Sequence, residues 1–315
     1  MLPPDFWVSL KDWTYRRLKK NIKLAKHAGF CYGVKRAVET TKKLKIENKD
    51  KEIFVLGELI HNSHVINELS SLGIHTVDEL PCACSLVSEN ETQKQEQICI
   101  IRSHGAAPEV FENAKNKGYE VVDLTCLDVK KVQQKAIELV QDGYLLVIVG
   151  KPEHPEVCAI RANAQTHGDN VFVAPDEQSL KSIEEEIKKH KKVGVVVQTT
   201  QKIENLQSIV NYLLPIAKEL KVFNTICAST SLRQTEARNL ARESDLMVVV
   251  GSKKSANTTH LAEILSEITA TIHIETAQEL ESYKELINKS QNIGVTAGAS
   301  TPDNIINDVI EKLNQ

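Results

Sequence analysis

The stretch AGFCYGVKRA, residues 28–37, places a cysteine between two glycines at the start of a predicted helix. Val34 and Ala37 begin an apolar stripe at helical spacing. The flanking glycines allow the backbone to turn tightly and to approach another group closely. Unpaired N–H groups at a helix start favour a thiolate over a thiol. The stretch therefore predicts that Cys31 has a chemical role.

The same context occurs twice more along the chain, at intervals of about one hundred residues. In each case a cysteine opens an amphipathic helical pattern. The three segments are CYGVKRAVETTKKL from Cys31, CLDVKKVQQKAIELV from Cys126 and CASTSLRQTEARNLA from Cys227. Repetition at a fixed interval indicates copies of one structural unit.

Each predicted helix is followed by a short apolar run that ends in glycine, at Gly57, Gly150 and Gly251. Apolar runs between helices are typical of buried parallel strands. We therefore predict an α/β fold of three similar modules, each with a small, mainly parallel sheet, around a pseudo-threefold axis. The predicted division is an N-terminal extension over residues 1–21 and modules over residues 22–125, 126–226 and 227–315.

Polar residues recur at two matched distances from the three cysteines. Thirty residues on stand His61, Glu156 and Asn257, and seventy-three residues on stand His104, Thr199 and Ser300. In open α/β sheets, the loops at the carboxyl ends of parallel strands line the ligand site. Polar loops follow strands in any α/β protein, but the agreement in three modules predicts one central cavity that contains these side chains and the three thiols.

Three cysteines from separate modules suggest a metal site. Three thiolates without a fourth ligand suit an iron–sulfur cluster with one iron open to substrate. Catalytic zinc with three cysteine ligands is the competing metal site, and three small buried hydrophobic side chains are the alternative without a metal. The remaining cysteines have no equivalents in the repeat: Cys99 is assigned to a strand interior, and Cys82, Cys84 and Cys158 are predicted to have no role.

Small polar donors beside glycines and helix starts suit an anion such as a diphosphate. Ser255, Asn257 and Ser300 lie in such contexts, although a helix cap is the ordinary explanation of each residue taken singly. His154 and Glu156 flank Pro155 directly after a predicted strand. A solvated loop pair is the ordinary explanation of that motif, but at the matched cavity position it is a candidate for proton delivery.

Composition narrows the classes of function. The 315 residues carry a net charge of −3, which gives no electrostatic reason to expect a nucleic acid partner. No apolar stretch reaches the roughly 18 residues of a membrane span, and the first residues lack the order of a secretory signal. We expect a cytoplasmic protein without structural disulfides. Neither a G-x-G-x-x-G fingerprint nor a P-loop is present.

The motifs resemble the 4-hydroxy-3-methylbut-2-enyl diphosphate reductase family, iron–sulfur oxidoreductases of the non-mevalonate isoprenoid pathway. The matching stretches, in the family's order, are GFCYGVKRAVE, GELIHN, SHG, DLTC, HPEV, QTT, NTIC followed by RQ, GSKKSAN and TAGASTPD. They extend from about residue 22 to the C-terminus. The resemblance implies that the chain reduces (E)-4-hydroxy-3-methylbut-2-enyl diphosphate to isopentenyl diphosphate and dimethylallyl diphosphate.

The resemblance also implies roles for individual residues. A [4Fe–4S] cluster would have Cys31, Cys126 and Cys227 as ligands, with its fourth iron open to substrate. Glu156 would deliver protons, with help from His154 and Thr199. The allylic diphosphate would be bound by His61, His104, His154, Thr199, Thr200, Ser255, Asn257 and Ser300.

Five positions depart from the family pattern: Leu127, Asp128, Cys158, Ala159 and Ala256. None of them removes an expected cluster ligand or the proton donor. Ala256 replaces a frequent serine and is expected to affect affinity for the diphosphate. Because no nicotinamide fingerprint is present, single electrons are expected from a ferredoxin or flavodoxin.

Two other functions remain open. One is an iron–sulfur Lewis-acid enzyme of the quinolinate synthase type, for which cationic groups would be expected around a dicarboxylate. The other is a non-enzymatic iron–sulfur redox sensor, which has little use for Glu156 and a set of anion donors.

Overall fold

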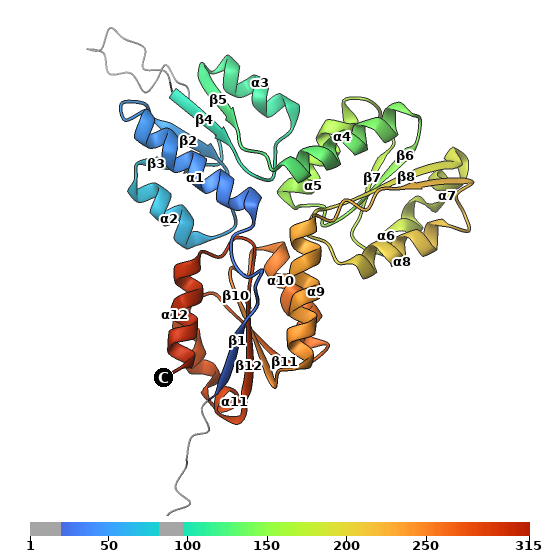
Figure 1. The fold of residues 1–315 in the computed structure, drawn as a ribbon. Coiled ribbons are helices and arrows are strands. Elements are labelled where there is room, and N and C mark those ends of the chain that lie inside the picture. Colours follow the sequence, from blue (N-terminus) through green and yellow to red (C-terminus); the bar gives the residue numbers. More distant parts are fainter. Residues whose placement is uncertain (1–19, 82–96) are drawn as a thin grey trace, which may run out of the picture.

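The computed structural model describes residues 20–81 and 97–315, which form three lobes that meet at one centre (Figure 1). Each lobe contains a four-stranded sheet in which every pairing between neighbouring strands is parallel. The predicted fold class, three similar α/β modules around a pseudo-threefold axis, is confirmed. Residues 1–19, Cys82 and Cys84 lie outside the described residues, so the predicted N-terminal extension falls almost wholly there.

The first module has the strand order β3-β2-β4-β5. Its strands are β2 (Ile53–Leu56), β3 (Ile74–Val77), β4 (Gln97–Ile101) and β5 (Tyr119–Asp123), and its helices are α1 (Tyr32–Glu47), α2 (Ser63–Ser71) and α3 (Pro108–Asn116). Cys99 is buried within β4, as predicted.

The second module repeats this arrangement with the order β7-β6-β8-β9. Its strands are β6 (Leu145–Val149), β7 (Val171–Ala174), β8 (Lys192–Val197) and β9 (Glu219–Val222). Its helices are α4 (Leu127–Gln141), α5 (Pro155–Gln165), α6 (Glu177–Leu180), the 3₁₀ helix η2 (Lys181–Ile183), α7 (Glu184–His190) and α8 (Ile203–Leu213).

The third module has the order β1-β12-β10-β11. Its strands are β1 (Asn21–Leu24), β10 (Leu246–Val250), β11 (Ala270–Ile274) and β12 (Asn292–Ala297). Its helices are α9 (Ala228–Arg242), α10 (Ala256–Ser266), the 3₁₀ helix η3 (Ala277–Tyr283), α11 (Lys284–Lys289) and α12 (Asp303–Leu313).

The predicted boundary at residue 22 is wrong, because β1 belongs to the third module. Its register pairs Ile22 with Ile293 of β12, and the dark-blue strand lies inside the orange-red lobe (Figure 1). The pattern is general: β5, β9 and β1 each occupy the edge of one sheet, and each is followed by the cysteine that opens the first helix of the next module. The chain therefore passes from module to module at the three cysteines.

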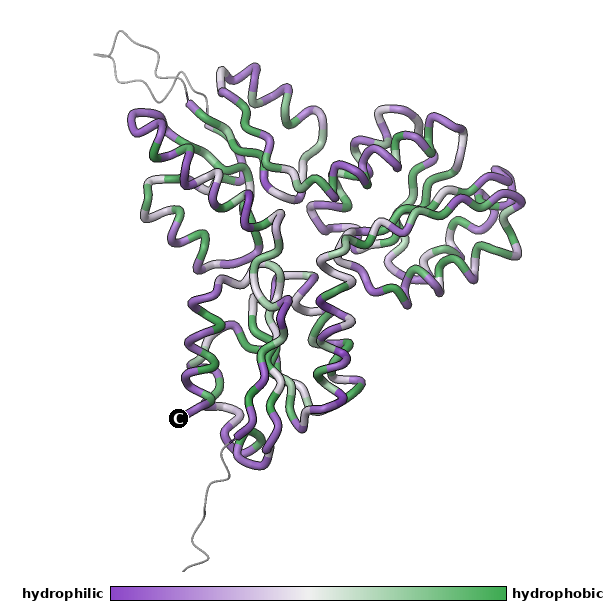
Figure 2. The backbone as a smooth tube through the Cα atoms, viewed as in Figure 1, coloured by the Kyte–Doolittle hydropathy of each residue, from purple (hydrophilic) through white to green (hydrophobic). Residues whose placement is uncertain are grey.

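Apolar side chains on both faces of each sheet hold the modules together. The strands β4, β6 and β10 are buried along their whole length, and Figure 2 shows hydrophobic residues concentrated along the strands. Such two-sided burial is expected of parallel sheets covered by helices. Within residues 20–81 and 97–315, no helix combines the length and the hydropathy needed to cross a membrane.

Candidate active site

A central cavity of about 100 Å³ lies where the three modules meet. Side chains from the cysteine helices and from the loops after β2, β4, β6, β8, β10 and β12 line it. All twelve predicted site residues belong to this lining: Cys31, His61, His104, Cys126, His154, Glu156, Thr199, Thr200, Cys227, Ser255, Asn257 and Ser300. No lysine or arginine is found among the described residues that line it.

The three cysteines occupy equivalent positions in the modules. Each is the N-cap residue of its helix, α1, α4 or α9. Each also donates its backbone N–H to a carbonyl in the loop after the central strand of the neighbouring module. These bonds run from Cys31 to Ala299 (3.2 Å), from Cys126 to Ser103 (2.9 Å) and from Cys227 to Thr199 (3.1 Å).

Gly33 explains how two of the thiols come close together. A Cβ atom at this position would lie 2.7 Å from the Sγ of Cys126 and 3.9 Å from the Sγ of Cys31. A contact of 2.7 Å is far inside van der Waals distance, so a side chain here would displace the Cys126 sulfur. Gly33, the second glycine of the AGFCYGVKRA stretch, therefore allows the Cys126 sulfur to approach the backbone closely, as the sequence predicted.

Burial governs the protonation of two of the thiols. Desolvation raises the pKa of Cys31, partly offset by the N–H of Val34, which lies 3.5 Å from its Sγ. Desolvation likewise raises the pKa of Cys227, although the hydroxyl and N–H of Thr230 oppose it. The N–H groups at these two helix starts favour the thiolate, as expected, but burial in the centre outweighs them.

Glu156 is the buried acid of the cavity, which Asp128 also lines. Its side chain is only 2% exposed, and burial raises its pKa to about 7 against the opposing effect of hydrogen bonds from Thr199. Thr199 donates its N–H to Oε1 (2.6 Å) and its hydroxyl to Oε2 (2.8 Å). A carboxyl group that is half protonated near pH 7 is suited to donate a proton.

His154 is the N-cap residue of α5, and its orientation follows from this position. Its Nδ1 accepts the N–H of Glu156 at 3.2 Å. Burial, and next the charge of His61, lowers the pKa of His154 to about 3. A neutral imidazole whose Nδ1 is an acceptor carries its proton on Nε2. His154 therefore offers an N–H donor.

Three histidines form a cluster in the cavity. The ring centroids of His61, His104 and His154 lie 4.5–5.8 Å apart, and one ring nitrogen from each falls within 4.8 Å of the others. Such proximity could serve a metal ion, but the Nε2 proton of His154 opposes coordination and favours an anion. Burial also lowers the pKa of His104 well below its usual value.

Buried polar atoms without a hydrogen-bond partner support the anion assignment. Within residues 20–81 and 97–315, the buried Nδ1 of His104 and the buried Nδ2 of Asn257 find no hydrogen-bond partner. Buried polar groups are normally satisfied. Ser255 is the N-cap residue of α10, yet its side chain makes no capping hydrogen bond. Capping therefore does not occupy these side chains, and they remain available to a ligand.

Ser300, the third candidate for the anion site, forms hydrogen bonds between the third and the first module. The hydroxyl of Ser300 donates to the carbonyl of His61 (3.2 Å), and Asn62 donates to the carbonyl of Ser300 (2.9 Å). Ser300 precedes α12, whose N-cap residue is Pro302. Ser300 is thus not a helix cap, and its hydroxyl links the first and third modules.

Several further side chains lie close to the thiols and were not predicted from the sequence. Thr230 places its Oγ1 3.1 Å from the Sγ of Cys227, and Tyr32 lies 3.8 Å from the Sγ of Cys126 while donating to Asp128. Arg233 is 3% exposed and donates to the carbonyls of Gly29 and Ala297. Only the RQ pair after NTIC pointed to Arg233. The contacts of Thr230 and Tyr32 depend on helix placement and had no sequence signal.

Comparison with known proteins agrees with this geometry. The family model described as LytB protein matches residues 22–314. The chain is 43% identical over 295 residues to 4-hydroxy-3-methylbut-2-enyl diphosphate reductase from Geobacter sulfurreducens, covering 93% of this chain and 97% of the relative. It is 39% identical over 297 residues to the protein of that name from Aquifex aeolicus, covering 94% of this chain and 96% of the relative.

Two solved structures share the fold. One, titled as (E)-4-hydroxy-3-methyl-but-2-enyl diphosphate reductase, the terminal enzyme of the non-mevalonate pathway, is 38% identical with a TM-score of 0.67, over 93% of this chain and 99% of its own. The structure of the reductase from Plasmodium falciparum has a TM-score of 0.82 at 24% identity, over 94% and 89% of the two chains, and supports the fold alone. With the resemblance confirmed along nearly its whole length, the chain belongs to the LytB protein family, that of the 4-hydroxy-3-methylbut-2-enyl diphosphate reductases.

Proposed function

We propose that this chain reduces (E)-4-hydroxy-3-methylbut-2-enyl diphosphate, removing its allylic hydroxyl and giving isopentenyl and dimethylallyl diphosphates. The reaction consumes two electrons and two protons and releases one water. One proton goes to the departing oxygen, and the other forms the new C–H bond. The observation that carries the proposal is Glu156, a buried carboxyl group with a pKa of about 7 in the same cavity as three thiols and several uncharged donors.

The thiols fit an iron–sulfur cluster. Three equivalent helix starts bring Cys31, Cys126 and Cys227 to one cavity, and Gly33 keeps a side chain away from two of the sulfurs. These three cysteines would hold a [4Fe–4S] cluster and leave one iron open to substrate. When bound, the cluster supplies single electrons and a Lewis-acidic iron. Three-cysteine zinc fits the ligand count, but zinc does not supply electrons.

The diphosphate is bound by donors that carry no fixed charge. His104, His154, Ser255 and Asn257 present ring N–H, hydroxyl and amide groups, with His61, Thr200 and Ser300 also in the lining. The unsatisfied Nδ2 of Asn257 finds an acceptor in a phosphate oxygen, as does the Nδ1 of His104 in the tautomer that carries its proton there, and the N-terminus of α10 adds unpaired N–H groups. Since the methyl side chain of Ala256 cannot donate a hydrogen bond, we expect a weaker affinity for the diphosphate than with a serine at this position.

Glu156 moves the proton. At neutral pH a substantial fraction of its carboxyl groups is protonated, so Oε1 or Oε2 can protonate the departing hydroxyl oxygen. The two hydrogen bonds from Thr199 hold the carboxyl group in one orientation. His154 bonds to the backbone of Glu156 and offers its own Nε2 proton to the substrate.

Electrons come from a one-electron carrier protein of the ferredoxin or flavodoxin class. The absence of a nicotinamide fingerprint in the sequence supports such a donor. The substrate is a small diphosphate, and neither nucleic acid nor a membrane is required for the reaction.

The test is anaerobic purification followed by iron and sulfide analysis and by turnover with reduced viologen. We expect about four irons per chain and reduction of the allylic diphosphate. Cys31→Ser, Cys126→Ser or Cys227→Ser should abolish the brown colour, while Cys158→Ser should keep it. Colourless protein with one zinc would refute the cluster, and brown protein without turnover would favour the redox sensor. Quinolinate formation would favour the Lewis-acid enzyme.

A further inference from the structure

We infer that His260 and Gln234 are positioning residues, through which the third module holds the segment that orients the proton donor. The inference rests on the function proposed above. The segment is Thr199–Gln201, which follows β8 in the second module and hydrogen-bonds to Glu156 through Thr199. Its own module does not hold all of its backbone groups. Two of its carbonyls bond instead to buried side chains of the neighbouring module.

His260 supplies the first of these bonds. It lies on α10, is 3% exposed, and its Nδ1 is 2.9 Å from the carbonyl oxygen of Thr200. A carbonyl can only accept, so Nδ1 carries a proton. Burial lowers the pKa of His260, and the charged groups that act on it are Glu263, Lys151 and Lys202. The imidazole is therefore neutral at pH 7 and keeps this tautomer.

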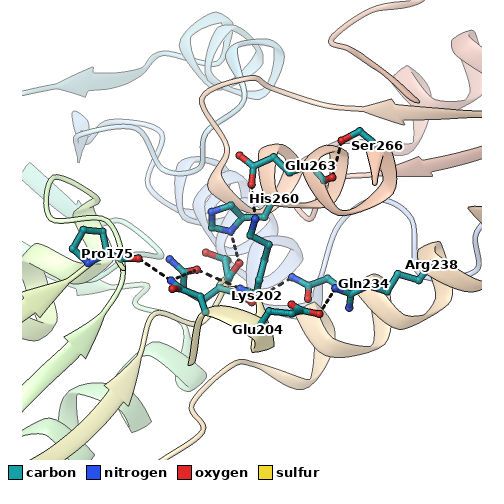
Figure 3. Close-up of polar contacts among 11 residues, drawn as sticks. Pro175, Lys202, Glu204, Gln234, Arg238, His260, Glu263 and Ser266 are labelled. Carbon is teal, nitrogen blue, oxygen red and sulfur yellow. Dashed lines mark hydrogen bonds and ion pairs between the residues drawn. The ribbon is translucent and has the colours of Figure 1, made fainter. Parts of the chain in front are cut away.

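Gln234 supplies the second bond. It lies on α9, is 4% exposed, and donates its Nε2 to the carbonyl of Gln201 at 3.3 Å. Gln201 is itself 3% exposed and donates its N–H to Gln198. Figure 3 shows both side chains reaching from the two helices toward the residues just before Lys202. The segment is thus held from α9 and α10 together.

Two ion pairs cross the same boundary but are exposed. Lys202 pairs with Glu263 at 2.9 Å, and Arg238 pairs with Glu204, as Figure 3 shows. Exposed ion pairs contribute little, because water and salt screen them. The buried bonds of His260 and Gln234 are made in a less polar setting, where losing one leaves an unsatisfied carbonyl. The ion pairs are therefore matched controls on the same two helices.

The consequence concerns Glu156. Its carboxylate form is stabilised by the N–H and hydroxyl of Thr199, and Thr200, which directly follows Thr199, is fixed by His260. If the segment loosens, these hydrogen bonds lengthen, and the pKa of Glu156 rises because burial is then less opposed. The acid would stay protonated to a higher pH but would be poorly oriented.

The experiment measures two quantities in the cluster-loaded protein: amide hydrogen exchange of residues 198–202, and the pH profile of kcat with reduced viologen. In His260→Ala and Gln234→Ala we expect exchange to become roughly two- to tenfold faster. The alkaline limb of the profile should move up by roughly half to one pH unit, and kcat should fall. His260→Asn keeps an N–H donor, so its amide exchange rate and its pH profile of kcat should be close to those of the parent. Glu263→Gln and Arg238→Gln should match the parent.

A folded His260→Ala variant with parental exchange and a parental alkaline limb would overturn the inference. If His260→Ala does not fold, the same two measurements on Gln234→Ala decide, and parental values there would overturn the inference. Failure of the proposed function is seen separately, because the parent itself would then not reduce the allylic diphosphate, while the exchange measurement still tests the contact between modules.

Discussion

At the scale of single residues, two groups at the start of α5 have opposite protonation preferences. Burial raises the pKa of Glu156 to about 7 and lowers that of His154 to about 3. Desolvation disfavours whichever form is charged, so the carboxyl group tends to keep its proton and the imidazole tends to stay neutral. The same physical effect thus provides an acid and an uncharged N–H donor two residues apart.

Glu156→Gln isolates the proton step. The variant keeps the size and shape of the side chain, and its amide oxygen can still accept the N–H of Thr199, but it cannot donate a carboxyl proton. We expect turnover to fall by roughly a hundredfold to ten-thousandfold, with cluster content and substrate affinity near the parent's. His154→Asn should cost less, because the carboxyl group remains. Steady-state reduction with an artificial one-electron donor measures both, and parental turnover in Glu156→Gln would assign the proton to another group.

The pKa of Glu156 also predicts a pH dependence. A general acid acts in its protonated form, so kcat should decline as the pH rises through about 7, the folded-state value. The decline should be absent from the residual activity of Glu156→Gln. Initial rates measured between pH 6 and pH 9, at a constant potential of the electron donor, would show this decline in kcat. A flat profile in the parent would mean that proton transfer by Glu156 does not limit the rate.

The anion donors give a third prediction. Ser255→Ala and Asn257→Ala should each weaken diphosphate binding by roughly 1–3 kcal/mol, the cost of one hydrogen bond to a charged group. Iron content should be unchanged, because neither side chain contacts a thiol. Calorimetric titration with substrate under anaerobic conditions measures the change. Unaltered affinity in both variants would remove these residues from the anion site.

At the scale of elements, the start of α1 is shaped by a neighbour from another module. Alanine normally suits a helix better than glycine by about 1 kcal/mol. At position 33 the added Cβ would lie 2.7 Å from the Sγ of Cys126. Crowding at the sulfur therefore outweighs the gain in helix propensity.

We expect Gly33→Ala to fold and to lose most of its iron. Lys35→Ala, on the exposed side of the same helix, is the control and should retain the parent's iron content. Iron and sulfide analysis after anaerobic reconstitution gives the result. Full iron content in Gly33→Ala would show that the Cys126 thiol can move aside without harm.

At the scale of the whole molecule, the three modules close into a ring because the first strand of the chain completes the last sheet. Ile22 of β1 packs against the core of the third module, seven residues before the loop reaches Gly29. The loop is further held by Arg233, which donates to the carbonyl of Gly29. The position of Cys31 thus depends on a module that is formed mostly from the far end of the chain.

Ile22→Ala tests this closure. Loss of a partly buried side chain should destabilise the protein by about 1–2 kcal/mol and should make the cluster easier to lose, since β1 anchors the segment that carries Cys31. Leu24→Ala, in the same strand but 46% exposed, should have little effect. The midpoint of urea unfolding and the rate of bleaching under a chelator report the two effects. Equal behaviour of the two variants would argue against a role for β1 in holding the ring.

Much of this protein follows from the sequence alone. The three modules, the cysteines at helix starts and the matched polar positions rest on local periodicity and on the rule that parallel strands end at one edge of a sheet. Tertiary structure alone decided the rest. The pairing of β1 with β12, the room that Gly33 leaves for Cys126, and the hold of His260 on Thr200 join residues that are distant in the chain. The raised pKa of Cys31 and the tautomer of His154 likewise depend on burial and on partners in space, which a linear pattern does not contain.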